Sequence, residues 1–242
     1  VDMTPYINDL ETKPTNTILN TGLYISSDDT ITAYYEVSNT NNCDIFSLKG
    51  TNGLGYEFYI PLHNNPNFYN HTFATNPAYA SFDIVATEDN TEIIIYTTTQ
   101  VDGHAAYTPF YITLNQGQTY SCAWTGANYT DPSTHPSGAV VVADKPIAIS
   151  IKDDSCHNPS GGCYDLMGDQ IVPIDVVGNE YIAVEGSLNA TGEESVFILA
   201  TENNTKLYID GSATPLTTLF AGQTYMYDIE GTNTTYIQTD KN

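Results

Sequence analysis

Apolar side chains recur at every second position of this chain, in short segments separated by turn residues. These segments are rich in Val, Ile, Tyr and Thr, the residues that strands favour. No window combines the three- and four-residue apolar spacing of an amphipathic helix with capping residues. The pattern therefore predicts an all-β protein with almost no helix. The expected strands are FDIVATE, TEIIIYTT, FYITL, QTYSCAW, AVVVAD, PIAISIK, QIVPIDV and EYIAVEG.

The chain also repeats itself. SFDIVATEDNTEIIIY (81–96) returns as SVFILATENNTKLYID (195–210), an offset of 195 − 81 = 114 residues. GQTYSCAWTG (117–126) returns as GQTYMYDIEG (222–231). Repetition on this scale indicates one structural module that is used more than once. A third signature occurs three times, at 22–30, 138–146 and 234–242.

One full module, 81–194, is predicted to contain eight antiparallel strands, which fits a jelly roll or another two-layer β-sandwich. Two four-stranded propeller-like blades would use the same strands and are the alternative. Residues 195–242 repeat the first half of this module, and 31–80 repeat the second half. We therefore predict tandem sandwich-like modules in circularly permuted register. The parts are an N-terminal extension (1–21), a half-module (22–80), the complete module (81–194) and a second half-module (195–242).

An open half-module would expose an unpaired strand edge and an apolar face, which proteins avoid. The full module continues from Pro146 into the strand IAISIK, whereas the sequence given stops at Asn242. The nearest equivalent of that strand is ITAYYEV, at 31–37. We expect it to complete the sheet begun by 195–242, either in the same molecule or head-to-tail in the next one.

The composition limits the classes of partner that we expect and indicates where the protein is located. The net charge is −23, and the six basic residues are all lysines. Because phosphate recognition depends on Arg and Lys, we expect neither nucleic-acid binding nor docking on anionic membranes. Scarce Lys with abundant Tyr, Asn and Thr favours an extracellular or cell-surface protein. No apolar stretch approaches the ~18 residues of a membrane span, and with no signal peptide we take the chain as a mature or excised segment.

A solvated secreted surface accounts for the acidity, and structural calcium is the alternative. The spaced Asp loop of an EF-hand is absent, and so are RTX nonapeptides. No other cofactor is expected. Five N-x-S/T sequons permit glycosylation without being evidence for it. They lie at Asn70, Asn128, Asn189, Asn203 and Asn233.

The densest local motif is DDSCHNPSGGCYD, at 153–165. Between Cys156 and Cys163 lie Pro and Gly residues that permit a tight reversal. In an extracellular chain this predicts a local disulfide. The alternative is a zinc site that adds His157 to the two cysteines, although the C-x₂-C spacing of common structural sites is absent.

By elimination, Cys43 and Cys122 would form a second disulfide, provided that their Cα atoms lie close enough. Catalysis has little support, because the G-x-S-x-G elbow is absent and no cysteine has a persuasive His-plus-acid setting. With 29 acidic residues, some carboxylate pair will reach catalytic distance by accident. Four histidines lie in polar loops, where we expect solvated side chains. They are His63, His71, His104 and His135.

Five blocks of the sequence carry a family resemblance: FDIVATEDNTEIIIY, LNQGQTYSCAWTG, VVVADKPIAISI, SC…GCYDLMGDQIVP and VGNEYIAVEG. Together they resemble the N-terminal domain family of the IgG Fc-binding proteins of mucus, which also occurs in bacterial secreted and surface proteins. The resemblance spans most of 22–242. It implies an extracellular, non-catalytic, β-rich module of a large multidomain protein. Immunoglobulin binding is not carried over, because these motifs hold no binding residues.

We expect a non-catalytic extracellular or cell-surface β-module with a structural or adhesive role. It would belong to a larger repetitive protein or to a head-to-tail surface fibre. Its partners would be other protein modules or copies of itself, and its ligand a glycan or a host protein. The alternatives are a carbohydrate- or protein-binding module and, third, a hydrolase in a jelly-roll scaffold. An exposed aromatic strip would favour the binding module, and convergent acids with perturbed pKa values in a cleft would favour the hydrolase.

Overall fold

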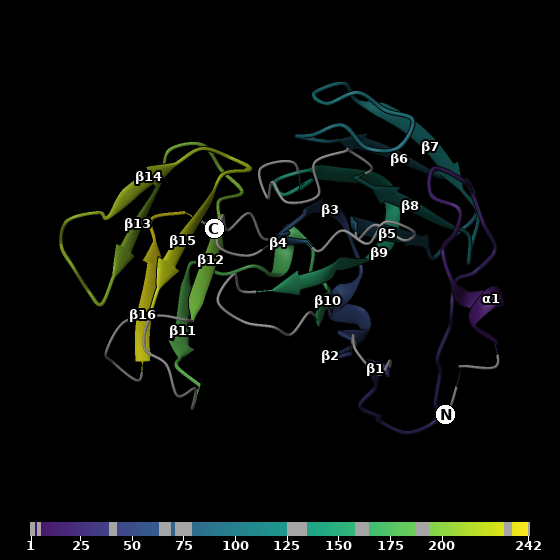
Figure 1. The fold of residues 1–242 in the computed structure, drawn as a ribbon, viewed down its shortest axis with the longest axis horizontal. Helices are drawn as coiled ribbons and strands as arrows, with labels where there is room; N and C mark the ends of the chain where they lie inside the picture. Colours follow the sequence, from purple (N-terminus) through teal and green to yellow (C-terminus); the bar gives the residue numbers. More distant parts are fainter. Residues whose placement is uncertain are drawn as a thin grey trace. The chain divides into compact units, whose positions relative to one another are not determined.

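The structure of this chain is a computed structural model, and Figure 1 shows its ribbon. Strands dominate it, beside one short helix, α1 (Ile7–Leu10), and 3₁₀ turns at Gly50–Gly53 and Ile174–Val176. The predicted all-β class is therefore confirmed. The chain divides into two compact units, Val1–Pro173 and Ile174–Asn242. The residues described are 3, 6–38, 43–62, 69–70, 79–124, 135–157, 165–186, 194–229 and 234–241.

The first unit is built on one long strand, β9 (Val140–His157). Its other strands are β1 (Tyr34–Val37), β2 (Asp44–Ser47), β3 (Gly55–Tyr59), β4 (Tyr69–Asn70), β5 (Ala80–Ala86), β6 (Thr91–Tyr96), β7 (Phe110–Leu114), β8 (Thr119–Ala123) and β10 (Asp165–Gln170). The first part of β9 pairs with β6 and β3, and the second part with β5, β10 and β4. β7 extends the sheet beyond β6, and β8 extends it beyond β5. Pro146 lies between the two parts, where its missing N–H suits a strand that turns from one layer into the other.

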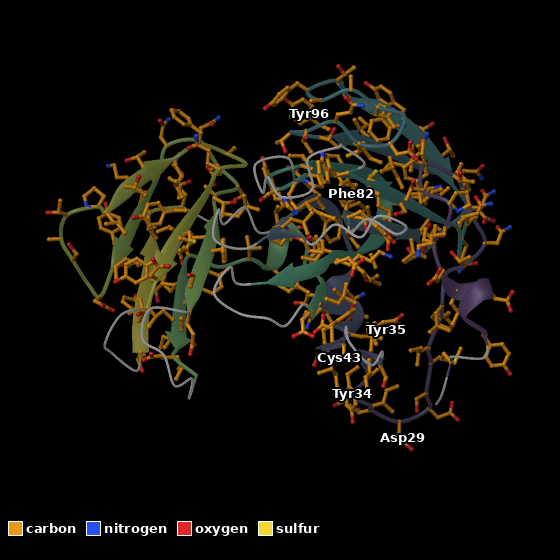
Figure 2. All side chains as sticks on the ribbon, in the orientation of Figure 1. Asp29, Tyr34, Tyr35, Cys43, Phe82 and Tyr96 are labelled. Atoms are coloured by element: carbon orange, nitrogen blue, oxygen red, sulfur yellow. The ribbon has the colours of Figure 1, made fainter. Side chains whose placement is uncertain are left out.

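Side chains of β6 alternate between the core and the solvent without exception, whereas all five residues of β8 are buried. Ile93 and Ile95 of β6 share one hydrophobic core with Phe82 and Ile84 of β5. Figure 2 shows Phe82 among the crowded side chains of this core. Because β6 and β5 pair with different parts of β9, the two parts form two layers around that core. The first unit is thus sandwich-like, whereas propeller blades would be separate four-stranded sheets.

The segment that precedes β1 covers one edge of this unit. Leu19 forms an isolated bridge with Thr119 of β8, and the Gly22 N–H donates to the Gly117 carbonyl at 3.0 Å. A Cβ on Gly22 would lie 2.6 Å from that carbonyl oxygen, so only glycine permits the approach. An otherwise open edge of β8 is therefore protected by chain from the N-terminal region.

The hairpin of β1 and β2 is tied to β10 by polar bonds. Asp44 Oδ2 accepts the Gly168 N–H at 2.6 Å, and Gln170 Oε1 accepts the Lys49 N–H at 2.5 Å. Lys49 Nζ also lies 2.9 Å from Asp169 Oδ1. These bonds hold the hairpin through β2 and the turn that follows it, rather than through β1.

The second unit contains a four-stranded and a two-stranded sheet. Its strands are β11 (Glu180–Val184), β12 (Ser195–Leu199), β13 (Thr205–Ile209), β14 (Thr217–Leu219), β15 (Thr224–Asp228) and β16 (Thr234–Thr239). The larger sheet has the order β11-β16-β13-β14, and β12 pairs with β15. All five residues of β12 are only half-buried, whereas most of β5, its counterpart in the repeat, is buried.

Shared strand registers confirm the predicted repeat. Phe82 opposes Cys122 in β5–β8, and Val196 opposes Tyr227 at the equivalent place in β12–β15. The two GQTY blocks thus enter the same strand of their repeats. Equal registers also relate β6–β7 to β13–β14, β6–β9 to β13–β16, and β3–β9 to β11–β16. The hairpin β1–β2 likewise repeats the pairing of β9 with β10.

The two units divide the chain differently from the predicted modules. β11 falls within 81–194 but pairs with β16, and β1 to β3 fall within 22–80 but belong to the first unit. The reason is that the last strand of each repeat pairs in the sheet of the following one: β3 with β9, and β11 with β16. Each sandwich therefore contains the last strand of the preceding repeat, while β1 and β2 join the first unit through the bonds to β10.

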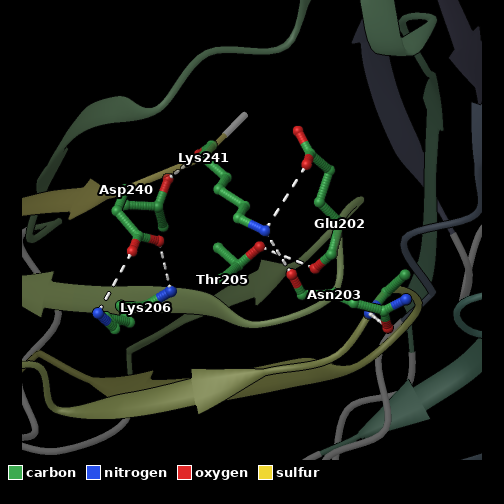
Figure 3. Close-up of polar contacts among 8 residues, drawn as sticks. Glu202, Asn203, Thr205, Lys206, Asp240 and Lys241 are labelled. Carbon is green, nitrogen blue, oxygen red and sulfur yellow. Dashed lines mark hydrogen bonds and ion pairs between the residues drawn. The ribbon is translucent and has the colours of Figure 1, made fainter.

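The Asp-Lys pair that follows the repeated strand binds the end of that strand to a nearby turn. We call this arrangement the lysine clasp. Lys241 Nζ donates to the Asn203 carbonyl at 2.6 Å and lies 3.8 Å from Glu202 Oε2, as Figure 3 shows. Asp240 Oδ1 accepts the Lys206 N–H at 2.7 Å. The clasp fastens the end of β16 to the turn between β12 and β13.

The first unit has the same clasp. Lys145 Nζ donates to the carbonyls of Asp89 and Asn90, and Asp144 Oδ1 accepts the Glu92 N–H at 2.8 Å. The third copy of the signature, at 22–30, has Asp29 in place of the lysine. An aspartate cannot donate to the carbonyls of such a turn, so this copy lacks the clasp, and within the described chain it forms no strand.

Candidate interaction surface

The predicted disulfide between Cys43 and Cys122 is not formed in this structure, where both cysteines are free. Cys122 lies on β8 and is 2% exposed within the core, whereas Cys43 is exposed just before β2. A side chain enclosed by the core cannot reach a partner on the surface. The backbone of Cys156 lies at the end of β9, and Cys163 lies outside the described residues. Their local disulfide therefore stays a prediction.

The reactivity of the cysteines follows from their surroundings. Burial raises the pKa of the Cys122 thiol well above its usual value, and the charge of Asp83 adds to this. We expect iodoacetamide to label Cys43 in the folded chain, while Cys122 reacts only after denaturation. Peptide mapping by mass spectrometry without reduction should show Cys156 joined to Cys163. Free thiols at both positions would contradict the disulfide, and rapid labelling of Cys122 would contradict its burial.

His104 and His135, the two histidines whose side chains the structure describes, are not solvated loop residues. His135 is 3% exposed, stacks on Trp124, and has Nε2 3.3 Å from Asp153 Oδ1, so the expectation of a solvated side chain was wrong here. The cause is enclosure by an aromatic ring and a buried carboxylate. His63 and His71 lie outside the described residues.

His104 is half-buried and stacks on Phe110, with a ring separation of 3.5 Å. Its Nε2 lies 3.0 Å from Asn16 Oδ1 and 3.2 Å from the Tyr120 hydroxyl. Burial lowers the pKa of His104, and the charge of Asp102 opposes this only in part. These contacts tie the N-terminal segment to β8.

Of the five sequon asparagines, Asn203 is described with its side chain. It is exposed in the turn that the lysine clasp closes, and its Oδ1 accepts the Ala221 N–H at 3.2 Å. Asn70 is described only through the backbone of β4. Asn128, Asn189 and Asn233 lie outside the described residues. Glycosylation stays a prediction at all five positions.

The outer face of the first unit carries a row of apolar side chains across three strands. Tyr111 of β7 opposes Ile94 of β6, which in turn opposes Val142 of β9. Beside them the rings of Tyr96 and Tyr107 lie 6.3 Å apart. Tyr107 and Tyr111 are 67% and 70% exposed. We call these five residues the tyrosine face; Figure 2 labels Tyr96 on it.

The tyrosine face was not singled out from the sequence, although a signal was present. The strand TEIIIY contains three consecutive isoleucines, so that apolar side chains emerge on both of its faces. One face supplies Ile93 and Ile95 to the core, and the other presents Ile94 to solvent. Strict alternation would have placed a polar residue there.

A second exposed apolar surface follows the N-terminal segment into the hairpin, and Figure 2 labels Tyr34 and Tyr35 there. Its members are Leu23, Tyr24, Ile25, Ile31, Tyr34, Tyr35 and Ile45. In the repeat, Ile31 corresponds to Ile147. Ile31 is 52% exposed and Ile147 is fully buried. The hairpin thus presents residues that its counterpart in β9 encloses.

One hollow of the described chain has carboxylates on its wall. A hollow of about 190 Å³ has Asp153 and Asp169 on its wall, which is below the roughly 300 Å³ at which small-molecule sites begin. Asp153 lies against His135 and Asp169 against Lys49, so both carboxylates have cationic or potentially cationic partners. Across the described ranges no three His, Cys, Asp or Glu residues gather as metal ligands. Nor is any helix there long and apolar enough to cross a bilayer.

Comparison with known proteins gives one match. A protein-family model described as "IgGFc binding protein" matches residues 44–242, which is most of the chain. The chain belongs to the IgGFc-binding protein family. No curated protein and no solved structure matches it significantly. The family resemblance predicted from the sequence is therefore confirmed. The match includes both units and begins at the first residue of β2, so this IgGFc-binding family member carries the family pattern through both repeats.

Proposed function

We propose that the chain is a non-catalytic, extracellular or cell-surface module that binds other proteins through the tyrosine face and has a structural or adhesive role. The observation that carries this is an exposed row of apolar side chains on a rigid sheet. Tyr and aliphatic side chains of this kind form the centres of protein interfaces, because they bury a large area at low entropic cost. The printed name of the family also describes a protein that binds a protein.

Tyr107 strengthens the proposal through its backbone. Its φ of 58° lies in the left-handed region, which bulky residues rarely occupy. The other described non-glycine residues with positive φ are Asn or Asp, which tolerate it. Such a conformation persists where its surroundings enforce it, and it commonly serves a binding or catalytic role. Here it places an exposed ring beside Tyr96.

A carbohydrate-binding module is the second candidate, and the same tyrosines favour it. A sugar stacks on the flat side of a ring, so a glycan platform needs rings that lie side by side in one plane. The planes of Tyr96 and Tyr107 differ by 57°, and their neighbours on the face are aliphatic. This geometry suits a protein surface better than a row of sugar rings.

Binding assays with a matched tyrosine control test the proposal. The probes are immobilised IgG Fc, fibrinogen and collagen, together with a glycan array. We expect saturable binding to at least one protein, weakened about tenfold or more by the double variant Tyr107→Ala/Tyr111→Ala, as for interface anchors. The control Tyr6→Ala/Tyr24→Ala removes two comparably exposed tyrosines elsewhere and should bind as the parent chain does.

Two results would contradict the proposal. Tyrosine-dependent binding to glycans alone would assign the face to carbohydrate. Equal loss in both double variants would show that binding does not use this face. Circular dichroism of each variant checks that the fold is retained.

A further inference from the structure

We propose that strand β1 of one copy of this chain adds to the edge of β12 in a second copy. The pairing would have the register that β9 has with β5. The contact uses β1 and β12 and none of the tyrosine face, so it can fail or hold independently of the proposed function.

The first unit shows what a complete second layer of this repeat contains. There the second layer includes four strands in the order β8-β5-β9-β10, and the short β4 also pairs with the end of β9. In the second unit, β15 and β12 repeat β8 and β5 with the same register. Among the described strands, β12 pairs with β15 alone, so the places of β9 and β10 are not filled there.

The hairpin β1–β2 is the counterpart of those two places. Its Tyr34 opposes Ser47 as Ser150 opposes Gln170 in β9–β10. The next bond agrees as well. The Leu48 N–H donates to the Ala33 carbonyl at 3.0 Å, and the corresponding bond of β9–β10, between Ile171 and Ile149, is equally long. β1–β2 is therefore a preformed half of the layer that β12–β15 lacks.

Backbone directions fit this pairing. In an antiparallel pair, alternate residues direct their N–H and C=O to opposite edges. Ala33 directs its carbonyl to β2, so Tyr34 directs its N–H and C=O to the other edge of β1. Ala200 donates to the Gln223 carbonyl beside β15, so Leu199 directs its groups to the far edge of β12. Each strand thus offers a row of groups on the side where the other is expected.

The repeat also sets the register. Ile84 opposes Ile149 in β5–β9, and the equivalent residues are Ile198 and Ala33. The burial of side chains also indicates that β12 lacks a neighbouring strand. Ile84 is fully buried, whereas Ile198 is half-buried, and the exposed Ile31 would come to lie opposite Ala200. Adding β1 would cover the half-buried Ile198 and the exposed Ile31.

In the described chain β1 and β12 belong to different sheets, and the repeat makes β1 of any copy the counterpart of the strand that β12 lacks, so we take a second copy as the occupant. Each copy carries both a β1 and a β12, so the contact is head-to-tail and can propagate into a fibre. Main-chain pairing along an edge is a common mode of strand addition. The charge of −23 on every copy opposes association, so we expect the contact to form most readily in moderate salt, which screens the repulsion.

Cross-linking between two different single variants tests the register. One preparation carries Ala33→Cys and the other Ile198→Cys, both in a Cys43→Ser background of the full chain. After mixing and mild oxidation, we expect a mixed disulfide between them, since closely opposed residues of an antiparallel pair suit a disulfide. The slipped pair, Tyr34→Cys with Ile198→Cys, places its thiols on opposite faces and should link about tenfold less. Peptide mapping identifies the linked residues.

A backbone variant separates strand addition from side-chain contact. Tyr34→Pro removes an N–H that points away from β2, so the hairpin should survive. We expect it to weaken self-association, measured by sedimentation velocity, by about tenfold or more, because an edge bond is lost and a ring occupies its place. Tyr34→Ala keeps the N–H and should weaken association only a few-fold.

Three outcomes would overturn the proposal. One is equal linking of the in-register and slipped pairs, and another is the absence of any mixed disulfide. The third is a link that forms only within a chain carrying both Ala33→Cys and Ile198→Cys, since that would place the two strands together in one molecule.

Discussion

Replacement of Ile84 by alanine should lower the free energy of unfolding of the first unit by about 3–4 kcal/mol. Ile84 lies on β5, is fully buried in the core, and leaves a cavity that its β-sheet neighbours cannot close. The single tryptophan, Trp124, is 3% exposed in the same unit, so its fluorescence reports this transition during urea unfolding.

The repeat supplies a matched control with the same residue type. Ile198 has the place of Ile84 in β12 but is only half-buried. Ile198→Ala should therefore lower the free energy of unfolding of the second unit by about 1 kcal/mol. Far-UV circular dichroism, at a dilution that keeps the chain monomeric, measures this loss. Equal losses at the two positions would show that β12 is as well covered as β5, which would also remove the basis for strand addition at its edge.

Replacement of Gly55 by alanine should destabilise the first unit by about 2–3 kcal/mol, at the upper end of overpacking effects. A Cβ at Gly55 would lie 2.3 Å from Cβ and 2.5 Å from Cγ of Pro173. A proline ring cannot swing aside as a flexible side chain can, so β3 or the segment after β10 must shift. The loss should appear in the Trp124 fluorescence transition.

Gly178 is the counterpart of Gly55 before β11, and an added Cβ there would make only ordinary van der Waals contacts. The nearest atom to an added Cβ there is the Glu180 carbonyl oxygen at 3.9 Å. Gly178→Ala should leave stability unchanged within about 0.5 kcal/mol, or raise it slightly by restricting the unfolded chain. A similar loss in both variants would mean that glycine is needed for backbone freedom at this turn, and the clash with Pro173 would not be the cause.

The sequence predicted the strands and the repeat well because both depend on local pattern. Alternating apolar residues gave the all-β class, and the repeated blocks placed β5 with β12 and β8 with β15 in equal registers. Strand partners were harder to predict. β11 stands next to β10 in the chain yet pairs with β16, because pairing is decided by which edges meet after the chain has folded.

Side-chain environment was the least predictable property. Cys122 and His135 stand in polar or mixed sequence, but a core strand encloses the first, while Trp124 and Asp153 enclose the second. Similarly, Ile94 lies between two core isoleucines, and only the observed sheet shows that it faces solvent. Burial depends on what packs from other parts of the chain, which residue type alone does not reveal.

The length of β9 has a consequence for how the molecule opens. Because this strand runs through both layers of the first unit, neither layer can separate without breaking bonds in the other, and the amides of β9 should exchange with deuterium only on global unfolding. In the described part of the second unit, no strand links β12–β15 to the larger sheet. Opening that pair therefore breaks no strand pairing of the larger sheet, and its amides should exchange with deuterium before those of β9.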